Sequence, residues 1–209
     1  NDVFLESQFD DGGEGTRYKY ELIYYSTLTV DGNPESLKRP PGFMKPNVFP
    51  VLGIDMAYMG EDPNAYRWNF LIRNQRAQDD FSRIIALTSA MNRPGTTVGS
   101  QLDLETQAAM DVDEWMRVFA FESLTGINDT FNQGLQHNLQ LYVRPEDQRV
   151  LALPWDMDFT FNHDTSSSIY GTGSRLSRVI QIPTNRRVFQ QHLWDMIQTT
   201  YNETYLRAW

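Results

Sequence analysis

The sequence is most informative at residues 153–161, which read Leu153-Pro154-Trp155-Asp156-Met157-Asp158-Phe159-Thr160-Phe161. Two carboxylates stand two positions apart among aromatic and apolar side chains. In an extended segment successive side chains point to opposite faces, so Asp156 and Asp158 are predicted to share one face. Ionised carboxylates are costly to bury, and two neighbouring ones repel each other. The stretch therefore predicts a bound cation, a hydrogen-bond network or open solvent, and a metal-dependent active site is our first hypothesis.

Length and composition limit the class of protein. The chain has 209 residues, of which 40% are hydrophobic and 13% aromatic, as is typical of a folded globular protein with a sizeable core. A net charge of −9 argues against a general nucleic-acid binder, because phosphate neutralisation needs clustered Lys and Arg. No apolar run reaches the length of about 18 residues that a transmembrane helix requires. The absence of Cys excludes disulfides and thiolate metal ligands.

The order of the predicted elements indicates an α+β chain, strand-rich at first and mostly helical later. Apolar residues at helical spacing predict helices, and alternating or β-branched runs predict strands. The predicted helices span residues 79–92, 113–125 and 185–206, and the predicted strands span residues 17–30, 139–143 and 149–153. The last two strands form a hairpin around residues 144–148. The Ser- and Gly-rich residues 165–177 predict a mobile segment.

Four polar side chains surround the predicted hairpin in a characteristic order. Asp129 lies on a loop after a helix, Asn138 stands at the entry of the hairpin, and Asp156 and Asp158 follow its exit. Mg²⁺ prefers carboxylate and amide oxygens together with substrate phosphates. Protein kinases place a catalytic Asp, an Asn ligand, a strand pair and a metal-binding Asp in this order. Their Asp and Asn are about five residues apart, whereas Asn138 follows Asp129 by nine, and the ordinary H-R-D, D-F-G and glycine-rich motifs are absent.

These residues resemble the spore coat protein H (CotH) kinase family along nearly the whole chain. The resemblance is strongest over residues 112–161, where the combination of motifs is specific. Weaker matches lie at Phe4-Leu5 to Phe9, at Tyr18-Lys19, at residues 66–70 and at Ile182-Pro183. The runs that carry the resemblance are Val112-Asp113-Glu114-Trp115-Met116-Arg117-Val118-Phe119-Ala120-Phe121-Glu122-Ser123-Leu124, Asn128-Asp129, His137-Asn138-Leu139-Gln140-Leu141-Tyr142 and Pro154-Trp155-Asp156-Met157-Asp158-Phe159-Thr160-Phe161.

The resemblance implies an atypical protein-kinase-like fold, with a partial strand-rich N-lobe followed by a mostly helical C-lobe. It also implies binding of ATP and Mg²⁺ (or Mn²⁺), and phosphorylation of Ser or Thr in a protein substrate. We expect residues 1–209 to form one CotH kinase-like domain that lacks the early N-lobe strands and the C-terminal end. The family's habit places the protein outside the cell or on a bacterial surface, as part of a larger surface protein or assembly. The expected partners are ATP and a protein, with no nucleic acid and no membrane span.

The order of the motifs assigns a role to each acidic or amide side chain. Asp156 is predicted to bind Mg²⁺ facing the phosphates, and Asp158 is either a second ligand or orients the first through a hydrogen bond. Asp129 is predicted to orient the substrate hydroxyl or accept its proton, although a helix-terminal Asx turn would also explain it. Asn138 is predicted to bind the metal or to hold the loop.

The remaining candidates are cations and apolar residues. Lys19 is predicted to pair with the ATP phosphates, although a solvated strand lysine is an equal alternative. Arg73 and Arg67 are weaker candidates for the same charge. The other interpretations are structural: a buried hydrogen bond for Glu122, and core positions for Trp115, Phe119 and Trp155.

Two other function classes stay open. A non-catalytic surface, coat or adhesion module could keep the same fold and bind Ca²⁺ or no ligand. A carboxylate-pair hydrolase is a more distant hypothesis, because acids two residues apart on one strand are a poor pair across a scissile bond. The set of Asp129, Asn138, Asp156 and Asp158 favours the kinase.

Overall fold

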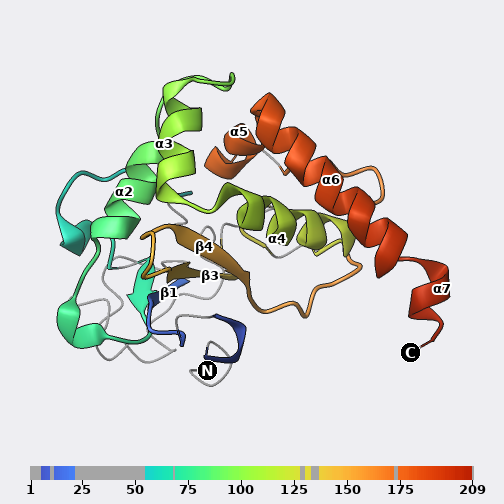
Figure 1. The fold of residues 1–209 in the computed structure, drawn as a ribbon, viewed down its shortest axis with the longest axis horizontal. Helices are drawn as coiled ribbons and strands as arrows, with labels where there is room; N and C mark the ends of the chain where they lie inside the picture. Colours follow the sequence, from blue (N-terminus) through green and yellow to red (C-terminus); the bar gives the residue numbers. More distant parts are fainter. Residues whose placement is uncertain are drawn as a thin grey trace, which may run out of the picture.

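The fold is a four-stranded antiparallel sheet covered on one face by helices (Figure 1). The computed structural model describes residues 6–9, 12–21, 55–67, 69–127, 130–132, 137–171 and 174–208. The strands are β1 (Thr16–Tyr20), β2 (Phe70–Ile72), β3 (Leu139–Val143) and β4 (Val150–Pro154), in the order β2-β1-β3-β4. The helices are α2 (Ser82–Met91), α3 (Gln101–Ala109), α4 (Val112–Leu124), α5 (Arg175–Gln181), α6 (Pro183–Thr199) and α7 (Glu203–Leu206), with short 3-10 turns η2 (Pro63–Ala65) and η3 (Arg76–Gln78). The α+β class is therefore confirmed.

The two faces of the sheet are covered differently. Tyr18, Tyr20 and Leu141 point toward the helices and belong to the main core together with residues of α2, α4, α5 and α6. The opposite face carries a small cluster in which Phe9 stacks on Tyr142, with ring centroids 4.5 Å apart. In Figure 1 the labelled helices α2 to α6 lie on one side of the sheet and the N-terminal segment on the other.

Helix α4 holds the edge strand β4 in place. The indole Nε1 of Trp115 donates to the carbonyl of Val150 at 2.8 Å, and Glu114 Oε2 accepts from the Ala152 N–H at 2.9 Å. Trp115 and Phe119 are fully buried, as predicted. An edge strand exposes unpaired main-chain groups unless another element covers them. The strand that leads to Asp156 is therefore fixed by α4.

The sequence predicted most elements of the second half correctly. The hairpin strands and the helix over residues 113–125 are found within one or two residues of their predicted bounds. The helix predicted over 79–92 begins only at Ser82, and the strand predicted over 17–30 is observed as Thr16–Tyr20, since residues 22–54 lie outside the described ones.

Two predictions about the C-terminal part need correction. The single helix predicted over 185–206 is broken after Thr199, because the Asn202 side chain accepts from the Tyr205 N–H at 2.9 Å and starts α7. The last three residues of the segment predicted to be mobile, 165–177, are helical, because α5 begins at Arg175. The Ser174 hydroxyl caps this helix by accepting from the Ser177 N–H at 3.0 Å, a common N-terminal signal.

The buried cap of α5 predicts a measurable contribution to stability. Besides capping the helix, Ser174 Oγ donates to Asn132 Oδ1 at 2.9 Å, and the residue is buried. We expect Ser174→Ala to lower the free energy of unfolding by about 2 kcal/mol, one part for the cap and one for the buried partner left without its donor. The matched control is Ser100→Ala, because Ser100 caps α3 through one 3.3 Å bond to the Asp103 N–H and should lose about 1 kcal/mol. Urea denaturation measures both, and equal losses would contradict a role for the Asn132 contact.

Candidate functional site

Three of the candidate residues, Asn138, Asp156 and Asp158, follow or precede strands at the same end of the sheet. Leu139 at the start of β3 pairs with Pro154 at the end of β4, and Tyr20 at the end of β1 pairs with Leu139. Asn138 precedes β3, and Trp155 follows β4 directly. The residue before one strand and the residues after its neighbour therefore leave the sheet at the same end. This end of the sheet is the candidate site.

The two carboxylates after β4 lie in an irregular turn. Strand β4 ends at Pro154, and Asp156 adopts a left-handed backbone conformation with φ of 58°. The prediction that Asp156 and Asp158 share one face of an extended segment was therefore wrong, because the alternation of side chains ends with the strand. Asp residues tolerate this conformation better than most other residues do. Both side chains are exposed, so neither carboxylate incurs the cost of burial and both are open to a ligand.

Asn138 lies directly before β3 and is buried, with 7% of its surface exposed. It too has a left-handed backbone, with φ of 52°, so the main chain turns sharply as it enters the strand. Asn is among the few residues other than Gly that occupy this region at low cost. Asn138 is thus a buried residue at the sheet end from which the chain leaves β4 toward Asp156.

Trp155 corrects one prediction about the core. Its side chain is 44% exposed, because the residue follows Pro154 and has already left the sheet. Lys19 Nζ lies 5.9 Å from the centroid of the indole ring, within reach of a cation–π interaction. Lys19 is therefore brought next to the residue that precedes Asp156.

The predicted cations do not converge on one point. Lys19 alternates with buried Tyr18 and Tyr20, faces away from the helices, and forms an ion pair with Glu21. The N–H of Arg73 donates to the Arg17 carbonyl at 2.8 Å, which puts Arg73 two residues further from the candidate site than Lys19. Lys19 is thus the described cation that the fold brings to this end.

The third candidate cation has a structural role elsewhere. Arg67 pairs with Asp79 and lies over the ring of Phe81, with its guanidinium carbon 5.0 Å from the centroid. The hydrogen bond from Arg67 holds the pKa of the Asp79 carboxyl below its usual range. Arg67 is therefore engaged by Asp79 and Phe81.

Asp129 lies outside the described residues, but both chain ends that lead to it are fixed. Gly126 ends α4 with φ of 62°, Ile127 is 1% exposed and Thr130 is fully buried. The role predicted for Asp129 stays a prediction.

The comparison with known families decides the relationship that the geometry suggests. A family described as CotH kinase protein matches residues 52–209, which include the hairpin, α4 and the Asp156 turn. The chain belongs to the CotH kinase family. No curated protein matches it.

The side chains at this end of the sheet include oxygen ligands of the kinds that Mg²⁺ prefers. Within the described residues, no group of three or more His, Cys, Asp or Glu side chains could hold a metal. Mg²⁺ is commonly bound by one or two carboxylates plus substrate phosphates and water, without a full protein cage. Two exposed carboxylates at Asp156 and Asp158, with the Asn138 amide at the same end of the sheet, are a suitable oxygen set.

Of the helices in the described ranges, none is long and apolar enough to cross a bilayer.

The CotH chain also contains a buried acid, Glu122, for which the sequence predicted a structural hydrogen bond. Glu122 of α4 is 2% exposed, and neither of its carboxylate oxygens completes a hydrogen bond with a described group. Burial raises the pKa of Glu122 to about 8, and the nearby Thr130 hydroxyl offsets only part of this rise. Glu122 is therefore predominantly protonated at neutral pH.

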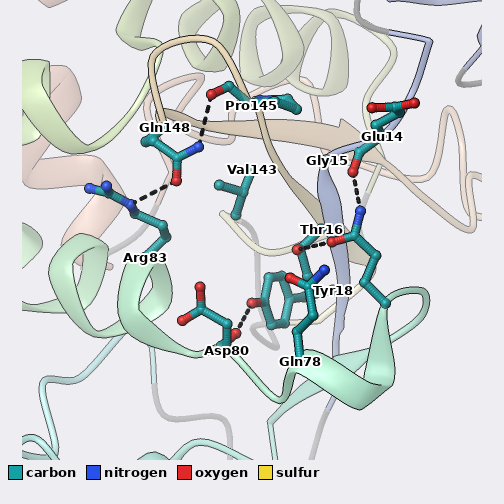
Figure 2. A pocket seen from close by; sticks show the side chains of 11 residues that line it. Glu14, Gly15, Thr16, Tyr18, Gln78, Asp80, Arg83, Val143, Pro145 and Gln148 are labelled. Carbon is teal, nitrogen blue, oxygen red and sulfur yellow. Dashed lines mark hydrogen bonds between the residues drawn. The ribbon is translucent and has the colours of Figure 1, made fainter.

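A polar pocket of about 150 Å³ lies at the opposite end of the sheet (Figure 2). In it the Tyr18 hydroxyl donates to the Asp80 carbonyl, and Arg83 Nε donates to Gln148 Oε1 at 3.2 Å. Its walls come from the start of β1, the end of β3 and the segment before α2. None of the described candidate residues lines it, so this pocket is separate from the candidate site at the other end of the sheet.

Proposed function

We propose that this chain is the phosphotransfer domain of an atypical, metal-dependent protein kinase with a protein-kinase-like fold. It transfers the γ-phosphoryl group of ATP to a Ser or Thr hydroxyl of a surface or coat protein. The membership of the CotH kinase family supports the reaction class. The single structural observation that carries the proposal is the common sheet end of Asn138 and the Asp156 turn.

The proposed reaction needs positioning and charge stabilisation more than covalent chemistry. Asp129 orients the acceptor hydroxyl and takes its proton while the new bond from oxygen to phosphorus forms. The bond between the γ-phosphorus and the bridging oxygen breaks, and ADP leaves. Bound Mg²⁺ would neutralise the charge of the phosphates, and Asn138 and Asp156 would hold it. Asp158 is either a further ligand or orients Asp156.

Lys19 is the described residue best placed to approach the phosphates. Its ion pair with Glu21 and its position over Trp155 hold it at the end of the sheet that carries Asp156. The same ion pair also favours the alternative of a non-catalytic surface module, because Glu21 already neutralises this cation. We propose the kinase as the first function, in one domain over residues 1–209 and located outside the cell or at a bacterial surface.

Phosphoryl transfer from γ-labelled ATP tests this function directly. With Mg²⁺ or Mn²⁺, the full-length wild type is expected to label a protein substrate or itself, and Asp129→Asn is expected to lose at least about 100-fold of that rate. ATP with Mg²⁺ should also raise the melting midpoint, since a ligand that binds only the folded state stabilises it. Unchanged labelling in Asp129→Asn would contradict its assigned role. A wild type without labelling or a midpoint shift would favour the non-catalytic module.

A further inference from the structure

A second cavity lies between the end of α4 and the segment that follows Asp158. It has a volume of about 280 Å³, comparable to the space that a large apolar side chain and its backbone occupy. Its walls include Leu124 and Gly126 on one side, and Phe161, His163 and Ile169 on the other. The two chain segments that form it are therefore direct continuations of the two that carry the proposed chemistry.

Main-chain hydrogen bonds hold the walls of this cavity together. The N–H of Phe161 donates to the Thr125 carbonyl at 2.8 Å, and the N–H of His163 donates to the Gly126 carbonyl at 3.0 Å. The Ser123 hydroxyl donates to the Ile169 carbonyl at 2.8 Å and closes the far side. The cavity is thus formed before any ligand arrives, which lowers the entropic cost of binding.

The chemistry of the walls selects an apolar occupant. Phe161 is 75% exposed and Ile169 is 42% exposed, so a bound apolar group would remove their surface from water. The described residues that line the cavity include Asp164 and His163 but no Lys or Arg. A phosphate would meet the negative charge of Asp164, so neither ATP nor its products suit this site. An uncharged aliphatic or aromatic side chain does.

Residues that line the cavity are close in sequence to Asp129, the residue proposed to orient the acceptor hydroxyl. Gly126 is three residues before Asp129, which limits their separation to about 11 Å. Phe161 is three residues after Asp158. An extended substrate covers about 3.3 Å per residue, so a residue in this cavity would lie within about four positions of a hydroxyl at Asp129.

We propose that this cavity binds a large aliphatic or aromatic side chain of the acceptor polypeptide, near the phosphorylated Ser or Thr, and so determines sequence specificity. The inference rests on the proposed kinase function and specifies its substrate. The substrate is an extended segment with a hydroxyl and a nearby Leu, Ile, Met or Phe. Phe161 and Ile169 are specificity-determining residues, and Asp129 remains the residue at the hydroxyl.

A positional scan of Ser peptides tests this specificity. Each position within four residues of the acceptor carries Leu, Phe, Ala or Asp in turn, and kcat/KM is measured with the full-length protein. We expect one position to favour Leu or Phe over Asp by about tenfold or more. Thr165→Trp, at an exposed residue that lines the cavity, should fill it and reduce this preference to within about twofold, with the Ala peptide unaffected. The control Thr97→Trp, at an exposed residue near α3, should keep the preference.

A second variant and a binding measurement separate this inference from the proposed function. Ile169→Thr shortens the apolar wall and adds a hydroxyl, so it should weaken the preference. It is the second variant in case Thr165→Trp fails to fold. Fluorescence anisotropy of a labelled Leu peptide without ATP should show tighter binding than the Ala peptide in wild type, and equal binding in Thr165→Trp. A kinase with no apolar preference, or with a preference that both variants keep, overturns the inference and leaves the function intact. A protein without transfer that still binds the Leu peptide in this manner supports the site and contradicts the function.

Discussion

Asp156→Asn is expected to lower the rate of phosphoryl transfer by about 1000-fold, equivalent to about 4 kcal/mol of transition-state stabilisation. The change removes one negative charge from the proposed metal site and keeps the size of the side chain. Asn tolerates the left-handed backbone that Asp156 adopts at φ of 58°, whereas Ala at this position would add strain. Because Asp156 is exposed, the free energy of unfolding should change by less than about 0.5 kcal/mol. Initial rates over a range of Mg²⁺ concentrations measure the effect.

The control is Asp195→Asn, which makes the same chemical change on α6. Asp195 is exposed and accepts from Gln191 Nε2 at 2.8 Å, a bond that Asn can also accept. We expect wild-type rates from this variant. Asp158→Asn distinguishes a second ligand from an orienting residue, since a ligand should raise the Mg²⁺ requirement as Asp156→Asn does. A rate within threefold of wild type for Asp156→Asn would place the metal elsewhere.

Local patterns predicted the elements that place the candidate site. The hairpin strands are short apolar runs on either side of a Pro-Glu-Asp loop, and their pairing was observed as predicted. Helix α4 has its aromatic residues at helical spacing, and its bounds were predicted to within one residue. In both cases burial on a single face determines the pattern, so sequence alone carries the signal.

The conformation after β4 could not be predicted in this way. The period-two rule holds only while the chain is extended, and Pro154 ends the strand before Asp156. The same departure from the sheet exposes Trp155, whose residue type alone predicted a buried side chain. The short helix α3 was missed because its two leucines, Leu102 and Leu104, stand two positions apart, which is not a helical spacing. Its Ser100 cap was an available signal.

Tertiary placement also decides the roles of the cations. The sequence predicted Lys19 on a strand and Arg73 as a weaker candidate for the same charge, but it contained no information on where either lies relative to Asp156. The antiparallel pairing of β1 with β2 places Lys19 opposite Leu71 and puts Arg73 beyond the pair. The register of β1 with β2 shows that Lys19, and not Arg73, approaches the Asp156 turn. This register cannot be read from a single sequence.

The second large effect is expected at Glu122, because burial of its carboxyl makes the free energy of unfolding depend on pH. A folded-state pKa of about 8 lies above the ordinary Glu value of about 4.3. Between these values the unfolded chain has released the proton and the folded chain has kept it, so rising pH stabilises the unfolded state relative to the folded one. Below about pH 4 both states are protonated, and above about pH 8 both are ionised. Stability is therefore expected to fall between pH 5 and 8 and to level off above pH 8.

Glu122→Gln is expected to remove this slope and to stabilise the protein by a few kcal/mol at pH 8, with little change at pH 4 to 5. The neutral amide has no carboxyl proton to lose, and it can hydrogen-bond with the nearby Thr130 hydroxyl. Part of the decline should persist, because burial also raises the pKa of Glu114 to about 8. Glu6→Gln at an exposed position is the control and should retain the full slope. Urea denaturation from pH 4 to 9 measures all three proteins, and a slope in Glu122→Gln equal to that of wild type would show that Glu122 is ionised in the fold.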